Sequence, residues 1–180
     1  MSVNLDFREL LSALADKQVK YLIVGGYAVA EHAEPRYTKD IDIWVEASPE
    51  NAAKIFQALR EFGAPLAGMT EDDFAHEGYF YQMGIPPTRV DVLMSIAGVT
   101  FADAWANRVE SDYGGVKALF ISKSDLITAK LAAGRPQDLL DAQVLALSNQ
   151  IVEKLQSKER EQTHQIEEPQ TRASDEETEW

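Results

Sequence analysis

The sequence contains no cysteine among its 180 residues. This absence excludes disulfide bonds, cysteine nucleophiles and zinc sites built on thiolates, and it is typical of proteins from reducing compartments. Long hydrophobic runs are also missing, because runs such as residues 21–24 are far too short to cross a bilayer. The first residues lack a basic segment followed by an apolar one, so we expect no secretory signal. These absences predict a soluble, cytoplasmic protein.

Positive charge is scarce, since 17 Lys and Arg stand against 30 Asp and Glu, which gives a formal net charge of −13. The imbalance is strongest in residues 157–180, which hold eight acids, three bases and almost no aliphatic side chain. Such a segment cannot bury enough apolar surface to offset the entropy of ordering it. We therefore expect residues 157–180 to form an acidic, disordered tail.

One region has the opposite charge balance. Residues 115–136 carry a single acid and four bases, which are Lys117, Lys123, Lys130 and Arg135. A locally basic stretch in an acidic protein is typical either of a site for an anionic ligand or of a solvated helix face. Composition alone leaves both interpretations open.

What remains is ordinary globular composition, with 45% hydrophobic and 26% charged residues. Periodicity and capping signals predict helices over residues 4–17, 27–33, 49–62 and 101–108 and after residues 122 and 136, and strands over residues 20–24, 40–46, 77–83, 88–94 and 116–121. This order predicts an α+β fold in which helices pack on a small mixed sheet. We expect one domain over residues 1–156, with a helical C-terminal part over residues 122–156.

Asp40 and Asp42 are two positions apart in the alternating segment DIDIWVE. On a strand, both side chains project from the same face while Ile41 and Ile43 enter the core. Two adjacent carboxylates repel each other, so the pair is typical either of a cation site or of solvated acids on an edge strand.

A third acid, Asp91, lies between Val90 and Val92 in a second alternating segment. If this strand lies beside residues 40–46, three carboxylates converge. Hard oxygen ligands without histidine or cysteine favour Mg²⁺ or Mn²⁺. A magnesium ion that keeps open positions is the usual partner of substrate phosphates.

Gly25 and Gly26 follow a predicted strand and open a predicted helix. Bare backbone N–H groups at a helix N-terminus favour bound phosphate. A glycine pair is most often a tight turn, and its position before the acidic pair is what indicates a phosphate site here.

The segment GGYAVAEHAEPRYTKDIDIWV, followed by RVDVL, resembles the signature of the minimal nucleotidyltransferases of the DNA polymerase β superfamily. The spacing of Arg36, Thr38, Asp40 and Asp42, and the later segment DLITAKLAAGRPQDLLDA, look most like abortive-infection type nucleotidyltransferases of toxin–antitoxin pairs and their uncharacterised relatives. The resemblance covers residues 20–147, with core motifs in residues 20–95. Gly26 stands where many catalytic members have serine.

The resemblance implies a metal-dependent nucleotidyltransferase that moves a nucleoside monophosphate from an NTP, such as ATP, to an acceptor hydroxyl. It implies that Asp40, Asp42 and Asp91 are the catalytic residues and hold Mg²⁺ or Mn²⁺. The expected nucleotide-binding residues are Gly25, Gly26, Arg36, Thr38, Lys130 and Arg135. Asp138 and Asp141 share one helix face, and we expect them to pair with Lys130 or Arg135 and orient these cations.

The acceptor stays open among an RNA end, a protein and a small molecule, and a cognate partner protein is a further expectation. Two other functions also stay open. One is a non-catalytic nucleotide-binding or partner-binding module of a two-protein regulatory pair. The other is an antibiotic nucleotidyltransferase, whose cationic acceptor suits acidic surroundings. We expect neither a membrane nor long duplex DNA as a partner, because no extended basic face is visible in the sequence.

Overall fold

The computed structural model describes residues 3–33 and 38–148 of the chain. Arg36 and the predicted tail over residues 157–180 lie outside the described residues. The chain divides into two units, Met1–Leu145 and Ala146–Trp180, and the first contains every strand and labelled helix. The predicted boundary at residue 156 stays a prediction.

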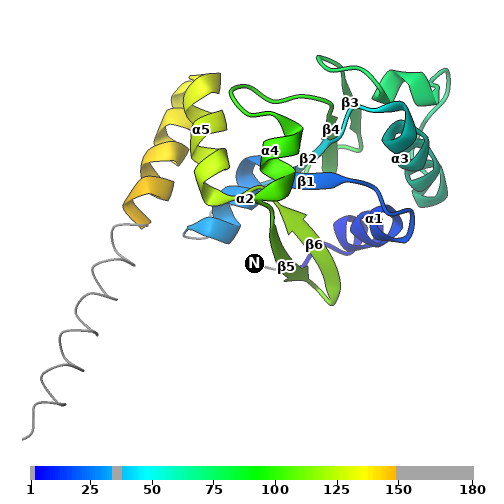
Figure 1. Cartoon of the computed structure of the whole chain (residues 1–180). Coiled ribbons are helices and arrows are strands. Elements are labelled where there is room, and N and C mark those ends of the chain that lie inside the picture. Colours follow the sequence, from blue (N-terminus) through cyan, green and yellow to red (C-terminus); the bar gives the residue numbers. More distant parts are fainter. Residues whose placement is uncertain (1–2, 34–37, 149–180) are drawn as a thin grey trace, which may run out of the picture. The chain divides into compact units, whose positions relative to one another are not determined.

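Six strands form one mixed sheet in the order β3-β4-β2-β1-β6-β5 (Figure 1). The strands are β1 (Tyr21–Val24), β2 (Asp40–Val45), β3 (Phe80–Met83), β4 (Arg89–Leu93), β5 (Val109–Tyr113) and β6 (Val116–Phe120). The central strand β2 pairs in parallel with β4 and antiparallel with β1, which pairs in parallel with β6. β3 and β4 form the predicted hairpin. The mixed sheet with packed helices confirms the predicted α+β class.

Several helices begin or end at the capping residues that the sequence offers. The helices are α1 (Leu5–Asp16), α2 (Gly25–His32), α3 (Pro49–Phe62), the 3₁₀ helix η1 (Glu71–Phe74), α4 (Phe101–Ala106) and α5 (Lys123–Ala133), and residues 136–148 are also helical. Asn4 and Ser48 cap α1 and α3 by accepting hydrogen bonds from backbone N–H groups. Gly134 ends α5 in the left-handed conformation, with φ of +66°. None of the helices in the described ranges is both long and apolar enough to cross a membrane.

The two faces of β2 have different surroundings. Ile41 and Ile43 are buried in the core on one face, as predicted. On the other face Asp40 and Asp42 are partly exposed, whereas Trp44 is buried and its ring lies edge-on to Phe101 of α4, 5.0 Å between centroids. Trp44 therefore packs under α4, and only the first part of this face is open to a ligand.

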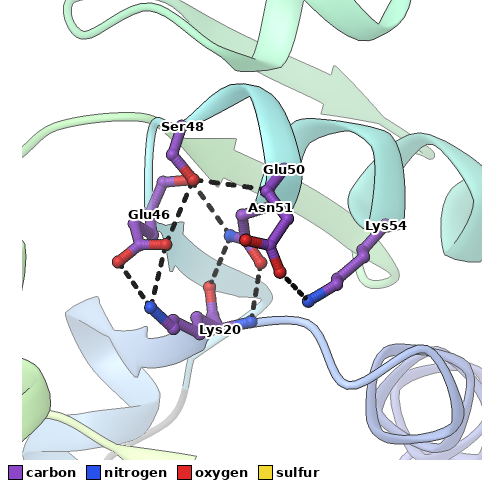
Figure 2. A network of polar contacts seen from close by, with 6 residues as sticks. All are labelled: Lys20, Glu46, Ser48, Glu50, Asn51 and Lys54. Carbon is purple, nitrogen blue, oxygen red and sulfur yellow. Dashed lines mark hydrogen bonds and ion pairs between the residues drawn. The ribbon is translucent and has the colours of Figure 1, made fainter.

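A buried amide joins β1, β2 and α3 (Figure 2). Asn51, 2% exposed, accepts a hydrogen bond from the Lys20 backbone N–H at 2.9 Å. Its Nδ2 donates to the carbonyl oxygens of Lys20 and Glu46, both at 3.0 Å. The Lys20 and Glu46 side chains form an ion pair above it at 2.9 Å. One side chain thus satisfies three backbone groups where β1 begins and β2 ends.

Replacing Asn51 with alanine should destabilise the protein by about 1–3 kcal/mol, because the Lys20 N–H loses its hydrogen-bond partner. The carbonyl oxygens of Lys20 and Glu46 each lose one of two donors, since they also accept from the backbone N–H groups of Glu46 and Ser48. Urea unfolding followed by circular dichroism measures the change. The matched control is Lys54→Ala on the same helix, which removes an exposed ion pair to Glu50 at 2.7 Å and should leave the midpoint nearly unchanged. Equal midpoint shifts for the two variants would contradict the role assigned to Asn51.

Candidate functional site

A cavity of about 570 Å³ lies where β1 ends and β2 and β4 begin. Its walls come from these three strands, from the start of α2, from the segment after β4, from α5 and from the start of the helix at residue 136. All the predicted site residues in the described part of the chain line this one cavity: Gly25, Gly26, Thr38, Asp40, Asp42, Asp91, Lys130 and Arg135. Residues up to 114 positions apart in the sequence, Val24 and Asp138, thereby meet at one site.

The register of β2 and β4 sets the positions of the acidic side chains. These strands are parallel neighbours, with Asp42 opposite Asp91 and Asp40 opposite Arg89. Directly paired residues of neighbouring strands project from the same face. The predicted neighbouring of the two strands is therefore present, and it places the three acids on one face of the sheet.

Gly25 allows the start of α2 to approach Asp42. Its φ is +61°, and a Cβ built at this position would lie 1.9 Å from Asp42 Oδ2. A side chain here would both strain the backbone and collide with the carboxylate. The N-cap residue Val24 makes no side-chain capping bond, so N–H groups of the first turn of α2 are available to a ligand.

Asp91 is held by two side chains that the sequence analysis did not single out. Gln82, opposite Asp91 on β3, donates from Nε2 to Asp91 Oδ1 at 2.8 Å. Arg89 Nη2 lies 2.6 Å from Asp40 Oδ2 and 3.4 Å from Asp91 Oδ2. The alternation of the segment RVDVL places Arg89 and Asp91 on one face, and this was the available signal for Arg89. The role of Gln82 depends on the hairpin register.

The pKa of Asp42 is raised to about 6. Burial is the main cause, and the negative charges of Asp91 and Asp40 add to it, while Lys130 and Arg89 act in the opposite direction. At Asp42 the repulsion from the two neighbouring carboxylates thus exceeds the attraction of the two nearby cations. A bound divalent cation would relieve this imbalance.

Lys130 is buried between two acids on the next helix, which lies beside α5 (Figure 1). Its Nζ donates to Asp138 Oδ1 at 2.7 Å and to Asp141 Oδ2 at 2.9 Å. Arg135, whose side chain is 77% exposed, also donates to Asp138. The expected pairing of these acids with Lys130 and Arg135 is present.

The donor set fits a hard divalent cation. Asp40 Oδ1 is buried and has no hydrogen-bond partner in the described structure, so one carboxylate oxygen is free for a ligand that supplies positive charge. No three His, Asp or Glu side chains within residues 3–33 and 38–148 converge closely enough to hold an ion as they stand. Arg89 is bound to Asp40 and Asp91 at this place.

Known structures share this fold. The solution structure of the antibiotic-resistance factor ANT(2'')-Ia has a TM-score of 0.53 at 16% identity, over 90% of this chain and 93% of that one. The crystal structure of a putative nucleotidyltransferase from Thermotoga maritima has a TM-score of 0.54 at 18% identity, over 84% and 91%. The crystal structure of ANT(2'')-Ia in complex with adenylyl-2''-tobramycin has a TM-score of 0.52 at 16% identity, over 87% of this chain and 96% of that one. At these identities the likeness concerns the fold.

Sequence comparison places the chain in a family. A search of curated proteins gave no match. The family model described as nucleotidyltransferase of unknown function (DUF6036) matches residues 2–180, which is nearly the whole chain. The resemblance to nucleotidyltransferases is thereby confirmed. The chain belongs to the DUF6036 family of nucleotidyltransferases.

Proposed function

We propose that this nucleotidyltransferase moves a nucleoside monophosphate from an NTP to an acceptor hydroxyl, with Mg²⁺ or Mn²⁺ held by Asp40, Asp42 and Asp91. The observation that carries the proposal is the shared cavity, whose lining includes three carboxylates, the open start of α2 and three cationic side chains. A triphosphate needs cationic and N–H partners, and an attacking hydroxyl needs a base. The residues around this cavity supply each of these groups.

The transfer step needs little from the protein beyond position and charge. The acceptor hydroxyl attacks the α-phosphorus, the bond from this phosphorus to the bridging oxygen breaks, and pyrophosphate leaves. Asp91 takes the hydroxyl proton as general base, and Gln82 fixes its carboxylate through the hydrogen bond to Oδ1. Bound metal ions would supply charge neutralisation on the triphosphate and acidification of the hydroxyl.

Some of the predicted nucleotide-binding residues offer groups that a phosphate can bind, whereas others are already bonded within the protein. Gly25 and Gly26 offer backbone N–H groups at the start of α2, and Arg135 offers an exposed guanidinium. The Thr38 hydroxyl donates to the backbone carbonyl of Asp40 at 3.2 Å. We therefore assign Thr38 the role of positioning the chain segment that enters β2. Lys130 lies at the cavity wall and is bonded to two acids, which leaves less of its charge for phosphate.

The proposal extends to a toxin–antitoxin or abortive-infection role, with an RNA end or a protein as acceptor. A small-molecule acceptor is the second candidate. It is favoured by the ANT(2'')-Ia structure with adenylyl-2''-tobramycin, which shows that this fold accommodates such an acceptor in another protein. The excess of acidic residues in this chain would attract a cationic acceptor by the same electrostatic principle.

Incubation with each labelled NTP, Mg²⁺ and one acceptor class at a time should place label on one class and on no other. The three classes are total RNA, proteins of the host cell and aminoglycosides. No label should be transferred when EDTA is present from the start of the reaction. Equilibrium dialysis with a non-hydrolysable NTP measures nucleotide binding separately. Metal-dependent nucleotide binding without transfer to any class would favour the non-catalytic module. Absence of both binding and transfer would contradict the proposed function.

A further inference from the structure

We propose that Arg89 is the internal counter-ion of the candidate metal site, that it must leave Asp40 and Asp91 when a divalent cation binds, and that it then serves as a phosphate ligand. The inference rests on the proposed function, because it takes Asp40, Asp42 and Asp91 to be the metal ligands. It assigns to Arg89 a binding role that connects metal binding with nucleotide binding.

The position of Arg89 follows from the sheet. Arg89 is the first residue of β4 and lies opposite Asp40 on β2, on the same face as Asp91. A single nitrogen, Nη2, contacts both acids, at 2.6 Å and 3.4 Å. The guanidinium therefore occupies the place between two predicted metal ligands.

The ion pair between Arg89 and the two acids leaves some of their polar atoms without hydrogen bonds. Asp40 Oδ1 and Arg89 Nε are both buried and lack hydrogen-bond partners in the part of the chain that the structure describes. A polar atom left in this way lowers the stability of its surroundings. The carboxylate and the guanidinium can therefore each bind another partner more favourably than they bind each other. A divalent cation suits the carboxylate oxygens, and phosphate oxygens suit the fork of an arginine.

Charge makes the two cations compete. A guanidinium stays charged at every accessible pH, so it cannot yield to a metal ion by losing a proton. Lys130, the other cation near Asp42, is already bonded to Asp138 and Asp141. Two positive groups at the same two carboxylates repel each other, so Arg89 has to turn away for the carboxylates to close around a metal ion.

The displaced side chain stays within the same cavity, since Arg89 lines it together with the start of α2 and Arg135. A triphosphate bound there would accept hydrogen bonds from the released guanidinium. Metal binding would then favour nucleotide binding, and by linkage the nucleotide would favour the metal. Arg89 thus neutralises Asp40 and Asp91 as long as neither the nucleotide nor its metal ion is bound.

The test measures Mn²⁺ binding by isothermal titration calorimetry without nucleotide, for the full chain and for Arg89→Gln. Glutamine removes the competing charge, so Mn²⁺ should bind about tenfold tighter, the effect typical of one neighbouring charge. In EDTA the variant should melt at a lower temperature than the unsubstituted protein, because Asp40 and Asp91 lose their counter-ion. Mn²⁺ should raise its melting temperature by more than it raises that of the unsubstituted protein.

The control is Arg108→Gln, which alters another partly buried arginine that stacks on Trp105, 4.3 Å from the ring centroid, and does not line the cavity. Its Mn²⁺ affinity should not change. Mn²⁺ affinity that is equal or weaker in Arg89→Gln would overturn the inference. If this variant does not fold, Arg89→Lys replaces the fork with a point charge. A released guanidinium then predicts that Arg89→Lys binds NTP more weakly than the unsubstituted protein in the presence of Mn²⁺, and unchanged NTP affinity would overturn the inference.

The result is separable from that of the proposed function. If Mn²⁺ binds the protein and Asp42→Asn prevents this, the metal site exists, whatever the acceptor. Tighter Mn²⁺ binding by Arg89→Gln then supports the role of Arg89 as counter-ion, even where no acceptor receives label. Failure of Mn²⁺ to bind the unsubstituted protein contradicts the proposed metal site itself, and with it the inference.

Discussion

Replacing Asp42 with asparagine should abolish nucleotide transfer and, at neutral pH, make the metal-free protein more stable. Asp42 lies at the centre of the candidate site, opposite Asp91 and against the backbone of Gly25. Loss of one carboxylate removes a metal ligand and the charge that goes with it, so we expect a fall in transfer rate on the order of a thousandfold, as for other residues that act as a catalytic unit. The labelled-NTP assay measures this rate.

The expected gain in stability follows from the raised pKa of Asp42, which is about 6 in the folded protein. An unfolded aspartate has a pKa of about 3.9. Folding therefore favours the protonated form, and stability falls as the pH rises from about 4 through 6, where the folded protein is forced to hold the charge. Above this range the penalty is complete, and it amounts to at most about 3 kcal/mol. Asparagine carries no charge and avoids the penalty.

Urea unfolding in EDTA at pH 4.5 and at pH 7.5 measures this effect. The gain from Asp42→Asn should be larger at pH 7.5. Asp16→Asn, an exposed acid at the end of α1 that does not line the cavity, is the matched control and should change neither transfer nor stability. An Asp42→Asn protein that still transfers nucleotide, or that is less stable than the unsubstituted protein at pH 7.5, would contradict the assignment of this residue.

Local signals in the sequence were sufficient for most elements of the fold. Asn4, Ser48 and Gly134 act within one turn of their helices, so their effect could be predicted without knowing the tertiary structure. Strand β5 was missed because VESDY has acids where a buried strand has apolar residues, and as an edge strand it is largely exposed. The strand order depends on packing between distant segments, and no local pattern encodes it.

The candidate site shows the same division. Residue types and spacing were enough to select the acids and glycines that line the cavity. The roles of Arg89 and Gln82 depend on which residue of one strand lies opposite which residue of the next. Asn51 was missed for a related reason, because a single amide in an otherwise amphipathic helix gives no sign that it is 2% exposed and bonded to two other segments.

Replacing Lys130 with methionine should destabilise the protein by about 3–5 kcal/mol, because it leaves two buried carboxylates without their shared cation. Asp138 and Asp141 are each only 3% exposed. Burial alone would raise the pKa of Asp138, but the hydrogen bonds from Lys130 and Arg135 outweigh it and hold this pKa below its usual value. Methionine fills a similar volume, so the loss would report charge and hydrogen bonding rather than packing.

The pH dependence separates this mechanism from a general loss of packing. A lowered pKa means that Asp138 stabilises the folded protein at pH values above the unfolded pKa, about 3.9, and that this contribution is lost as the pH falls. Without Lys130 the acids can become neutral by taking up protons, so the deficit of Lys130→Met should shrink between pH 7.5 and pH 4.5. Urea unfolding at both values measures it. Lys117→Met, in which an exposed ion pair to Glu110 at 2.7 Å is lost, should show little change at either pH.

A triple variant decides whether Lys130 serves the fold, the nucleotide or both. Lys130→Met combined with Asp138→Asn and Asp141→Asn removes the cation together with the charges that it neutralises. Much of the lost stability should return, because no unpaired charge remains buried. If this stable variant binds NTP and Mn²⁺ as tightly as the unsubstituted protein, Lys130 holds α5 to the next helix and contributes nothing to phosphate binding. The matched control is the double variant Asp138→Asn with Asp141→Asn, because Asp138 also lines the cavity and accepts a hydrogen bond from Arg135. NTP binding that is weaker in the stable triple variant than in this double variant would assign Lys130 to the triphosphate as well.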